Sequence, residues 1–104
     1  MQNEVLKINK NGETLIITKS AAETNGQFTE FEGTDEPGVG PPMHVHFKQE
    51  EKVKVVKGKM HVKTLTKEFS LTEGEEYIFA PAEAHQFWNE GDQTLHYMLS
   101  LIHI

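Results

Sequence analysis

The sequence predicts a single all-β domain, a sandwich or barrel of antiparallel strands with little or no helix. Apolar and polar residues alternate along most of the chain, which is the period of half-buried strands and not of helices. Turn-forming residues separate about nine short strands at intervals of about eight to twelve residues, a spacing typical of sandwiches and barrels. The chain has 104 residues, enough for one domain with its own core, so residues 1–104 are expected to form one unit.

The first elements are expected to be a hairpin, a strand and a long loop. Asn11-Gly12 separates two β-rich runs and predicts a hairpin over residues 4–19, because both central positions of a type I′ turn take a positive φ. A third strand is expected over residues 27–34. Residues 35–42 contain three prolines and two glycines, so they can join neither a sheet ladder nor a helix.

The remaining strands are expected to follow this loop closely. The turn of a second hairpin is predicted at residues 57–59, and turn-rich segments at 81–83 and 89–92 separate the later strands. The strands are expected within residues 43–47, 52–65, 67–71, 75–80, 85–89 and 94–104.

Composition narrows the classes of function. The chain has no cysteine, so any metal must be held by histidine and carboxylate side chains. A formal net charge of −6 argues against a nucleic-acid partner. No apolar run is long enough to cross a bilayer and the N-terminus lacks a secretory pattern, so a cytoplasmic protein is expected. Several lysines alternate with valines, which indicates the solvated outer face of a sheet: Lys48, Lys52, Lys54, Lys57, Lys59, Lys63 and Lys67.

One short segment carries residues suited to metal coordination. His44 and His46 are two positions apart, so on a strand their side chains leave the same face with Cα atoms about 6.5–7 Å apart. A short reversal is expected at residues 47–50. After it, Glu51 shares its face with the valines of the next strand, which must face the interior, whereas Glu50 shares the exposure of the lysines. Glu51 is therefore favoured over Glu50 as a third ligand.

A fourth candidate ligand is His85, which begins a later strand and shares its face with Phe87. Three imidazoles and one carboxylate suit iron, manganese, nickel, cobalt, copper or zinc, and leave open positions on a six-coordinate ion for a substrate or dioxygen. Ligand type does not choose among these metals. A lone His-x-His pair is weak support, so the prediction depends on the inward glutamate and the later histidine together.

These residues resemble the motifs of the cupin superfamily over residues 38–89. In the first motif, a glycine is followed after five residues by His-x-His, then by a glutamate and, six residues later, by another glycine. The residues that match this spacing without a gap are Gly38, His44, His46, Glu51 and Gly58.

The second cupin motif is matched in part. Gly74, His85 and Asn89 keep the family spacing. Ala80 stands where proline is usual and Ala82 where glycine is usual, so the turn before His85 departs from the pattern.

The resemblance implies a jelly-roll barrel, an antiparallel double-stranded β-helix, with one divalent metal ion near its centre. The implied ligands are His44, His46, Glu51 and His85. The chain is similar to single-domain cupins compared with quercetin-type dioxygenases, which implies a metal-dependent, dioxygenase-like enzyme acting on a small oxygen-rich molecule. Decarboxylase chemistry is also compatible with the family.

Two alternatives stay open at this point. One is a non-catalytic module that binds or senses a metal or a small molecule. The other is a sugar isomerase, which would need a further base near the metal. The candidates for that base are Tyr77, Tyr97 and His96.

The pocket and the partners can also be predicted. The residues expected to line the pocket are Phe47, Met60, Phe87 and His96. Trp88 is out of phase with Phe87 and is expected on the opposite face, where an indole suits a subunit contact. Small cupins are commonly dimers, so a homodimer with a small-molecule ligand is expected, without nucleic acid or membrane as a partner.

Overall fold

The structure, a computed structural model, has the predicted all-β fold and describes residues 7–10, 12–43, 45 and 48–103. This described part contains nine strands and no helix. It accordingly offers no helix of the length and apolarity that crossing a membrane requires. The strands are β1 (Lys7–Lys10), β2 (Glu13–Lys19), β3 (Phe28–Asp35), β4 (Gln49–Lys57), β5 (Lys59–Thr64), β6 (Glu68–Thr72), β7 (Glu76–Phe79), β8 (His85–Asn89) and β9 (Leu95–His103).

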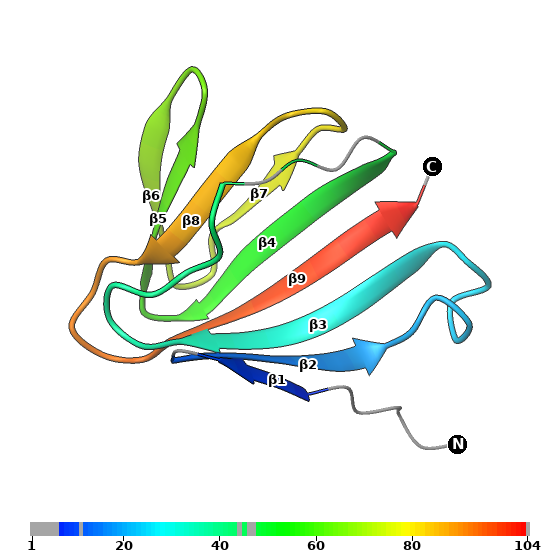
Figure 1. Ribbon diagram of the computed structural model, residues 1–104, viewed down its shortest axis with the longest axis horizontal. Helices are drawn as coiled ribbons and strands as arrows, with labels where there is room; N and C mark the ends of the chain where they lie inside the picture. Colours follow the sequence, from blue (N-terminus) through cyan, green and yellow to red (C-terminus); the bar gives the residue numbers. More distant parts are fainter. Residues whose placement is uncertain (1–6, 11, 44, 46–47, 104) are drawn as a thin grey trace.

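The strands form two antiparallel sheets (Figure 1). The larger sheet has the order β1-β2-β3-β9-β4-β7, and the smaller has the order β6-β5-β8. β9 therefore lies between β3 and β4. It pairs with β3 along eight residues of each strand, from Phe28 with Ile102 to Asp35 with Leu95. Segments far apart in the sequence thus become neighbours, as a jelly-roll topology requires.

The core follows the period of two that the sequence predicts. On β4 the side chains of Glu51, Val53 and Val55 are buried, whereas Lys54 and Val56 are exposed. β8 also buries every second residue. Burying a large apolar side chain stabilises the fold by about 1.5–3 kcal/mol, so the core that the two sheets share holds them together. Its buried members are Val53, Val55, Met60, Val62, Leu71, Phe79, Phe87, Leu95 and Tyr97.

The loop after β3 is held closely against β8. The Gly38 N–H donates to the Asn89 carbonyl oxygen at 2.9 Å, and the Asn89 N–H donates to the Val39 carbonyl oxygen at 3.0 Å. At Gly40 a Cβ atom would lie 2.0 Å from the carbonyl oxygen of Phe87. Because that oxygen belongs to the backbone of a core strand and cannot move away, only glycine fits this approach.

The strand predicted at residues 43–47 lies largely outside the described residues. His44, His46 and Phe47 are not among them. Met43 and Val45, which the structure does describe, belong to no strand, and β4 begins at Gln49.

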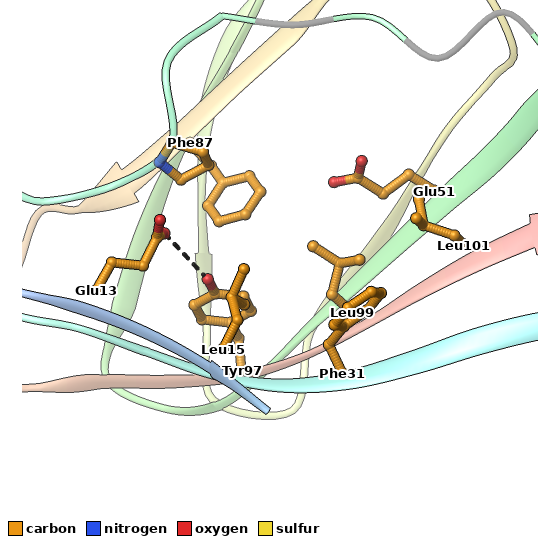
Figure 2. A pocket seen from close by; sticks show the side chains of 9 residues that line it. Glu13, Leu15, Phe31, Glu51, Phe87, Tyr97, Leu99 and Leu101 are labelled. Carbon is orange, nitrogen blue, oxygen red and sulfur yellow. Dashed lines mark hydrogen bonds between the residues drawn. The ribbon is translucent and has the colours of Figure 1, made fainter. Parts of the chain in front are cut away.

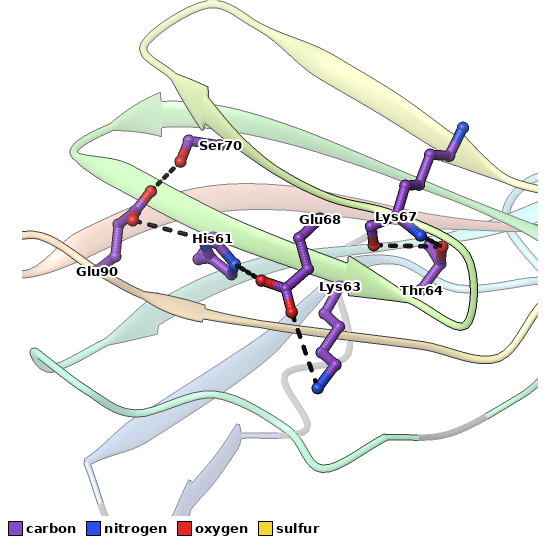
Figure 3. A network of polar contacts seen from close by, with 7 residues as sticks. All are labelled: His61, Lys63, Thr64, Lys67, Glu68, Ser70 and Glu90. Atoms are coloured by element: carbon purple, nitrogen blue, oxygen red, sulfur yellow. Dashed lines mark hydrogen bonds and ion pairs between the residues drawn. The ribbon is translucent and has the colours of Figure 1, made fainter.

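The outer face of the three-stranded sheet is polar (Figure 3). The ring of His61 lies between two carboxylates, with Nε2 3.2 Å from Glu68 and Nδ1 3.4 Å from Glu90. Glu90 also accepts a hydrogen bond from the Ser70 hydroxyl, and Lys63 lies 3.8 Å from Glu68. Ion pairs at a surface contribute about 0–1 kcal/mol each, so this partly exposed network adds little stability.

Trp88 belongs to the same outer face. Its ring lies against that of His61, with centroids 4.6 Å apart and an interplanar angle of 32°. The alternation along β8 therefore places Trp88 opposite His85 and Phe87, as its position in the sequence predicts.

Candidate metal centre

Glu51 lies on the inner face of β4, as the alternation of this strand predicts. Its Cα pairs with Phe79 of β7 on one side and with Leu101 of β9 on the other. Only 1% of Glu51 is exposed, whereas Glu50 belongs to the other face and is half-buried. A buried carboxylate is stable only with a cation or hydrogen-bond donors close to it, so its surroundings indicate what it can bind.

His85 begins β8, and its imidazole is oriented from two sides. The ring stacks on Phe79 with centroids 3.8 Å apart and an interplanar angle of 6°. Nδ1 lies 2.9 Å from the carbonyl oxygen of Glu83. Because a carbonyl oxygen only accepts hydrogen bonds, Nδ1 carries the hydrogen and donates it. This tautomer leaves Nε2 as the nitrogen that can bind a metal.

Glu51 and His85 meet in the interior, where the distance between Glu51 Oε1 and His85 Nε2 is 3.0 Å. In a neutral imidazole with its hydrogen on Nδ1, Nε2 presents a lone pair, and the carboxylate oxygen presents another. Two lone pairs at this distance repel each other unless a proton or a metal cation neutralises them. One imidazole nitrogen and one carboxylate oxygen, both buried, are therefore a donor set that fits a divalent metal ion of the predicted kinds.

The other two predicted ligands, His44 and His46, lie outside the described residues, as does the predicted pocket residue Phe47. Within the part of the chain that the structure describes, no three histidine, aspartate or glutamate side chains are grouped so that they could hold a metal. The described residues thus bring together two of the four predicted ligands, Glu51 and His85.

A cavity of about 180 Å³ lies beside Glu51 (Figure 2). Glu51 lies on one side of it, and Glu13 and Tyr97 lie on the other. The described residues of the wall between them are apolar: Leu15, Phe31, Pro41, Phe87, Leu99 and Leu101. Among its described residues, the cavity therefore has polar groups on two opposite sides and apolar side chains between them.

The structure describes three of the four residues that were predicted to line the pocket, and only one of the three lines the cavity. Phe87 lines the cavity. Met60 is fully buried in the core cluster and is not among the cavity residues. His96, predicted to line the pocket, is instead exposed on the outer face, because it precedes Tyr97 on β9 and successive side chains of a strand leave opposite faces.

Glu13 is a cavity residue that sequence reasoning misses. It shares the inner face of β2 with Leu15, but the alternation of an N-terminal hairpin does not say which of its faces is covered. The hydroxyl of Tyr97 donates to Glu13 Oε2 at 3.4 Å. Burial raises the pKa of Tyr97 above its ordinary value, and the carboxylates of Asp35 and Glu13 raise it further. Tyr97 is therefore a hydrogen-bond donor at any ordinary pH.

The chain matches the model of a known protein family. The family model Cupin_2, described as "Cupin domain", matches residues 31–102. The chain belongs to the cupin family. The matched segment runs from β3 to β9 and includes both Glu51 and His85.

Asn89, which ends the second motif of this cupin, supports the backbone around it. Its Nδ2 donates to the carbonyl oxygens of Asp35 at 2.9 Å and Gln93 at 2.7 Å. Its Oδ1 accepts the N–H of Gly91 at 2.8 Å. All three partners are backbone groups, so the side chain ties the end of β3 and the turn before β9 to β8.

The departure of this cupin from the second motif has a visible consequence at Ala82. Its φ is 67°, in the left-handed region where glycine is favoured. The turn thus takes a positive φ at the position where the second cupin motif usually has glycine, although alanine occupies it here. The next residue, Glu83, supplies the carbonyl oxygen that orients His85. A residue with a strained backbone therefore lies next to the candidate metal centre.

Replacing Ala82 with glycine should therefore raise the free energy of unfolding by about 0.5–1 kcal/mol. The change removes the cost of a Cβ atom at positive φ, and the greater freedom of glycine in the unfolded chain offsets part of the gain. Urea denaturation measures the difference. The matched control is Ala84→Gly, at a position without positive φ, which should lower stability by about 0.5–1 kcal/mol. A loss of stability in both variants would contradict this explanation.

Several solved structures resemble this chain over most of its length. A predicted oxalate decarboxylase from Thermotoga maritima matches with a TM-score of 0.82 and 17% identity, covering 96% of this chain and 92% of that one. A sugar phosphate isomerase of the cupin superfamily from Silicibacter pomeroyi matches with a TM-score of 0.75 and 19% identity, covering 90% of this chain and 61% of that one.

A third match has a metal in its description. It is the oxalate decarboxylase of Bacillus subtilis, studied for its Mn(II) centres, with a TM-score of 0.83 and 20% identity, covering 93% of this chain and 27% of that one. This cupin thus spans less than two thirds of the Silicibacter and Bacillus chains. At these identities the matches establish the fold. No curated protein sequence matches the chain.

Proposed function

We propose that this cupin is a metal-dependent enzyme, dioxygenase-like in its chemistry, that acts on a small oxygen-rich molecule bound in the apolar cavity. The observation that carries the proposal is the pair formed by Glu51 and His85. A buried carboxylate oxygen and an imidazole nitrogen lie 3.0 Å apart, and the other nitrogen of the ring donates to the Glu83 carbonyl. This arrangement supports a cation between the two side chains.

The residues of the chain have distinct tasks in this proposal. Glu51 and His85 would hold the metal, together with His44 and His46 as the motif implies. A bound divalent metal supplies a Lewis acid and, if it is redox-active, a centre for electron transfer. Phe79 stacks on His85 and limits the orientations of its ring, so Nε2 keeps its direction when a ligand enters.

The cavity restricts the size and nature of the substrate. Its volume of about 180 Å³ is below the range of about 300–1,000 Å³ typical of sites for drug-sized ligands. The leucine and phenylalanine side chains on its wall lower the polarity of the space beside Glu51, which strengthens electrostatic interactions there. A small molecule with few polar groups beyond its metal-binding oxygens fits these walls best.

The solved relatives support a metal-centred reaction without choosing one. One is described as an oxalate decarboxylase with Mn(II) centres and another as a sugar phosphate isomerase. Most of the described wall residues are apolar, which supports a dioxygenase-like reaction over sugar chemistry, because a sugar needs a hydrogen-bond partner for most of its hydroxyl groups.

Replacing Glu51 with glutamine should lower the metal content of the purified protein at least about tenfold, because it removes the negative charge from the donor set. Elemental analysis of protein purified without a histidine tag and without chelator measures this. The matched control is Glu50→Gln, which removes the same charge from the neighbouring residue on the other face of β4 and should leave the metal content unchanged.

The metal contents of the two variants and the turnover of the wild type lead to different conclusions. Loss of metal in Glu50→Gln with retention in Glu51→Gln would overturn the assignment of Glu51. Stoichiometric metal in the wild type, together with oxygen consumption on catechol or a flavonol, would support the dioxygenase-like reaction. Stoichiometric metal without turnover of any small oxygen-rich molecule would favour the non-catalytic binding module instead.

A further inference from the structure

Glu13 and Tyr97 meet on the side of the cavity opposite Glu51 (Figure 2). The Tyr97 hydroxyl donates to Glu13 Oε2 at 3.4 Å, and both residues line the cavity. The described wall residues between this contact and Glu51 are apolar. The cavity therefore has a second polar region, which the proposed metal centre does not use.

The contact between Glu13 and Tyr97 depends on Gly33. Tyr97 of β9 and Gly33 of β3 are Cα partners, and a Cβ atom on residue 33 would lie 2.3 Å from Tyr97 Cζ and 2.7 Å from its hydroxyl oxygen. Because glycine leaves this space open, the tyrosine ring crosses over β3 and reaches Glu13 on β2, the next strand of the sheet. A close approach of ring and backbone thus positions the hydroxyl.

Asp35 lies beside this contact. Its Cα pairs with that of Glu13, so the two side chains leave the same face with Cβ atoms about 4.5–5.5 Å apart. Asp35 has no exposed surface, and neither carboxyl oxygen makes a hydrogen bond of ordinary geometry with the described residues. Burial, and then the neighbouring Glu13, raise the pKa of Asp35 to about 8, and Tyr97 opposes this shift. At neutral pH Asp35 therefore holds its proton.

We propose that Glu13 and Tyr97 form a second binding subsite of the cavity, one that takes a hydroxyl group of the ligand. A half-buried carboxylate next to an apolar wall gains most from a hydrogen-bond donor. A hydroxyl suits the site better than an ammonium group, because a charged donor would have to leave water for a wall of leucine and phenylalanine side chains.

The subsite adds a second contact for the substrate of the proposed function. It rests on the proposed function only for the end of the ligand that would bind the metal. The substrate class it indicates is a small, largely apolar molecule with two polar ends. Oxygen atoms at one end would face Glu51 and His85, and a hydroxyl at the other end would donate to Glu13.

The test compares phenol with benzene, which differ by one hydroxyl group and need no metal in order to bind. An apolar cavity of about 150 Å³ in another protein binds benzene, so about 180 Å³ is large enough here. Isothermal titration calorimetry gives both dissociation constants for the wild-type protein as purified. Phenol should bind at least about tenfold more tightly than benzene, the ratio expected for one hydrogen bond to a charged acceptor.

Two variants and a control separate the subsite from the rest of the cavity. Glu13→Leu should abolish the preference for phenol while benzene still binds, and Tyr97→Phe, which keeps the ring, should reduce it. Glu32→Leu makes the same change on the solvent face of the larger sheet and should keep the full preference.

The outcomes also distinguish this inference from the proposed function. Equal binding of the two compounds by the wild type, or binding of neither, would overturn the subsite, as would a preference that survives Glu13→Leu. Metal content is measured on the same samples. A protein that prefers phenol through Glu13 but holds no metal would contradict the proposed function and leave the subsite in place.

Discussion

The free energy of unfolding should fall as the pH rises from about 4 to about 8, because Asp35 keeps its proton in the folded protein. Its pKa is raised from 3.8 to about 8, first by burial and then by Glu13. Between these values the unfolded chain releases the proton and the folded chain retains it, so protons favour the folded state. This contribution is fully present below about pH 4, decreases by at most about 1.4 kcal/mol per pH unit, and is lost as the pH passes 8.

Asp35→Asn should flatten this dependence, because asparagine has no proton to lose. Urea denaturation at pH 5, 6, 7 and 8 measures the difference between variant and wild type, which should shift in favour of the variant as the pH rises. Glu36→Gln is the control, since Glu36 is exposed and should leave the wild-type slope in place. Parallel curves for Asp35→Asn and the wild type would show that another group controls the stability in this range.

Asn89→Ala should lower the free energy of unfolding by about 4 kcal/mol. The variant loses the two donors to the carbonyl oxygens of Asp35 and Gln93 and the acceptor for the N–H of Gly91. The bond to Asp35 is buried, so its loss costs about 1–3 kcal/mol, and the half-buried bonds to Gln93 and Gly91 add about 1 kcal/mol each. Asn89 is only 1% exposed, so water replaces these bonds poorly.

Urea denaturation at a single pH measures this loss, and Gln86→Ala is its control. Gln86 lies on the outer face of the same strand and is half-buried, so its truncation should change the stability by no more than about 0.5 kcal/mol. A loss below about 1 kcal/mol for Asn89→Ala would mean that the turn before β9 is held by other contacts.

Glu51 illustrates what the sequence could predict about the site. The valines that follow it at alternate positions, Val53 and Val55, identify the inner face of β4, and the structure buries all three side chains. Local alternation sufficed because a strand with one apolar face has only one way to lie on a core. Its nearness to His85 was expected from the motif spacing, and the structure places these two side chains 3.0 Å apart.

Tyr97 illustrates what the sequence could not predict. Its contact with Glu13 depends on the pairing of β9 with β3 and on the absence of a side chain at Gly33. Such register between distant strands has no local signal in the sequence. The error at His96 is of a different kind, because the apolar residues on either side of it, Leu95 and Tyr97, already indicated that it faces outward.

The position of β9 affects how the chain can be assembled during synthesis. β9 follows every other strand in the sequence, yet it lies in the middle of the larger sheet (Figure 1). A nascent chain emerges from its N-terminal side first, so β3 and β4 leave the ribosome with the edges that β9 will cover still open. Open strand edges are sites of aggregation. Completion of the larger sheet therefore waits for residues 95–103, and the edges of β3 and β4 that β9 covers stay open until they emerge.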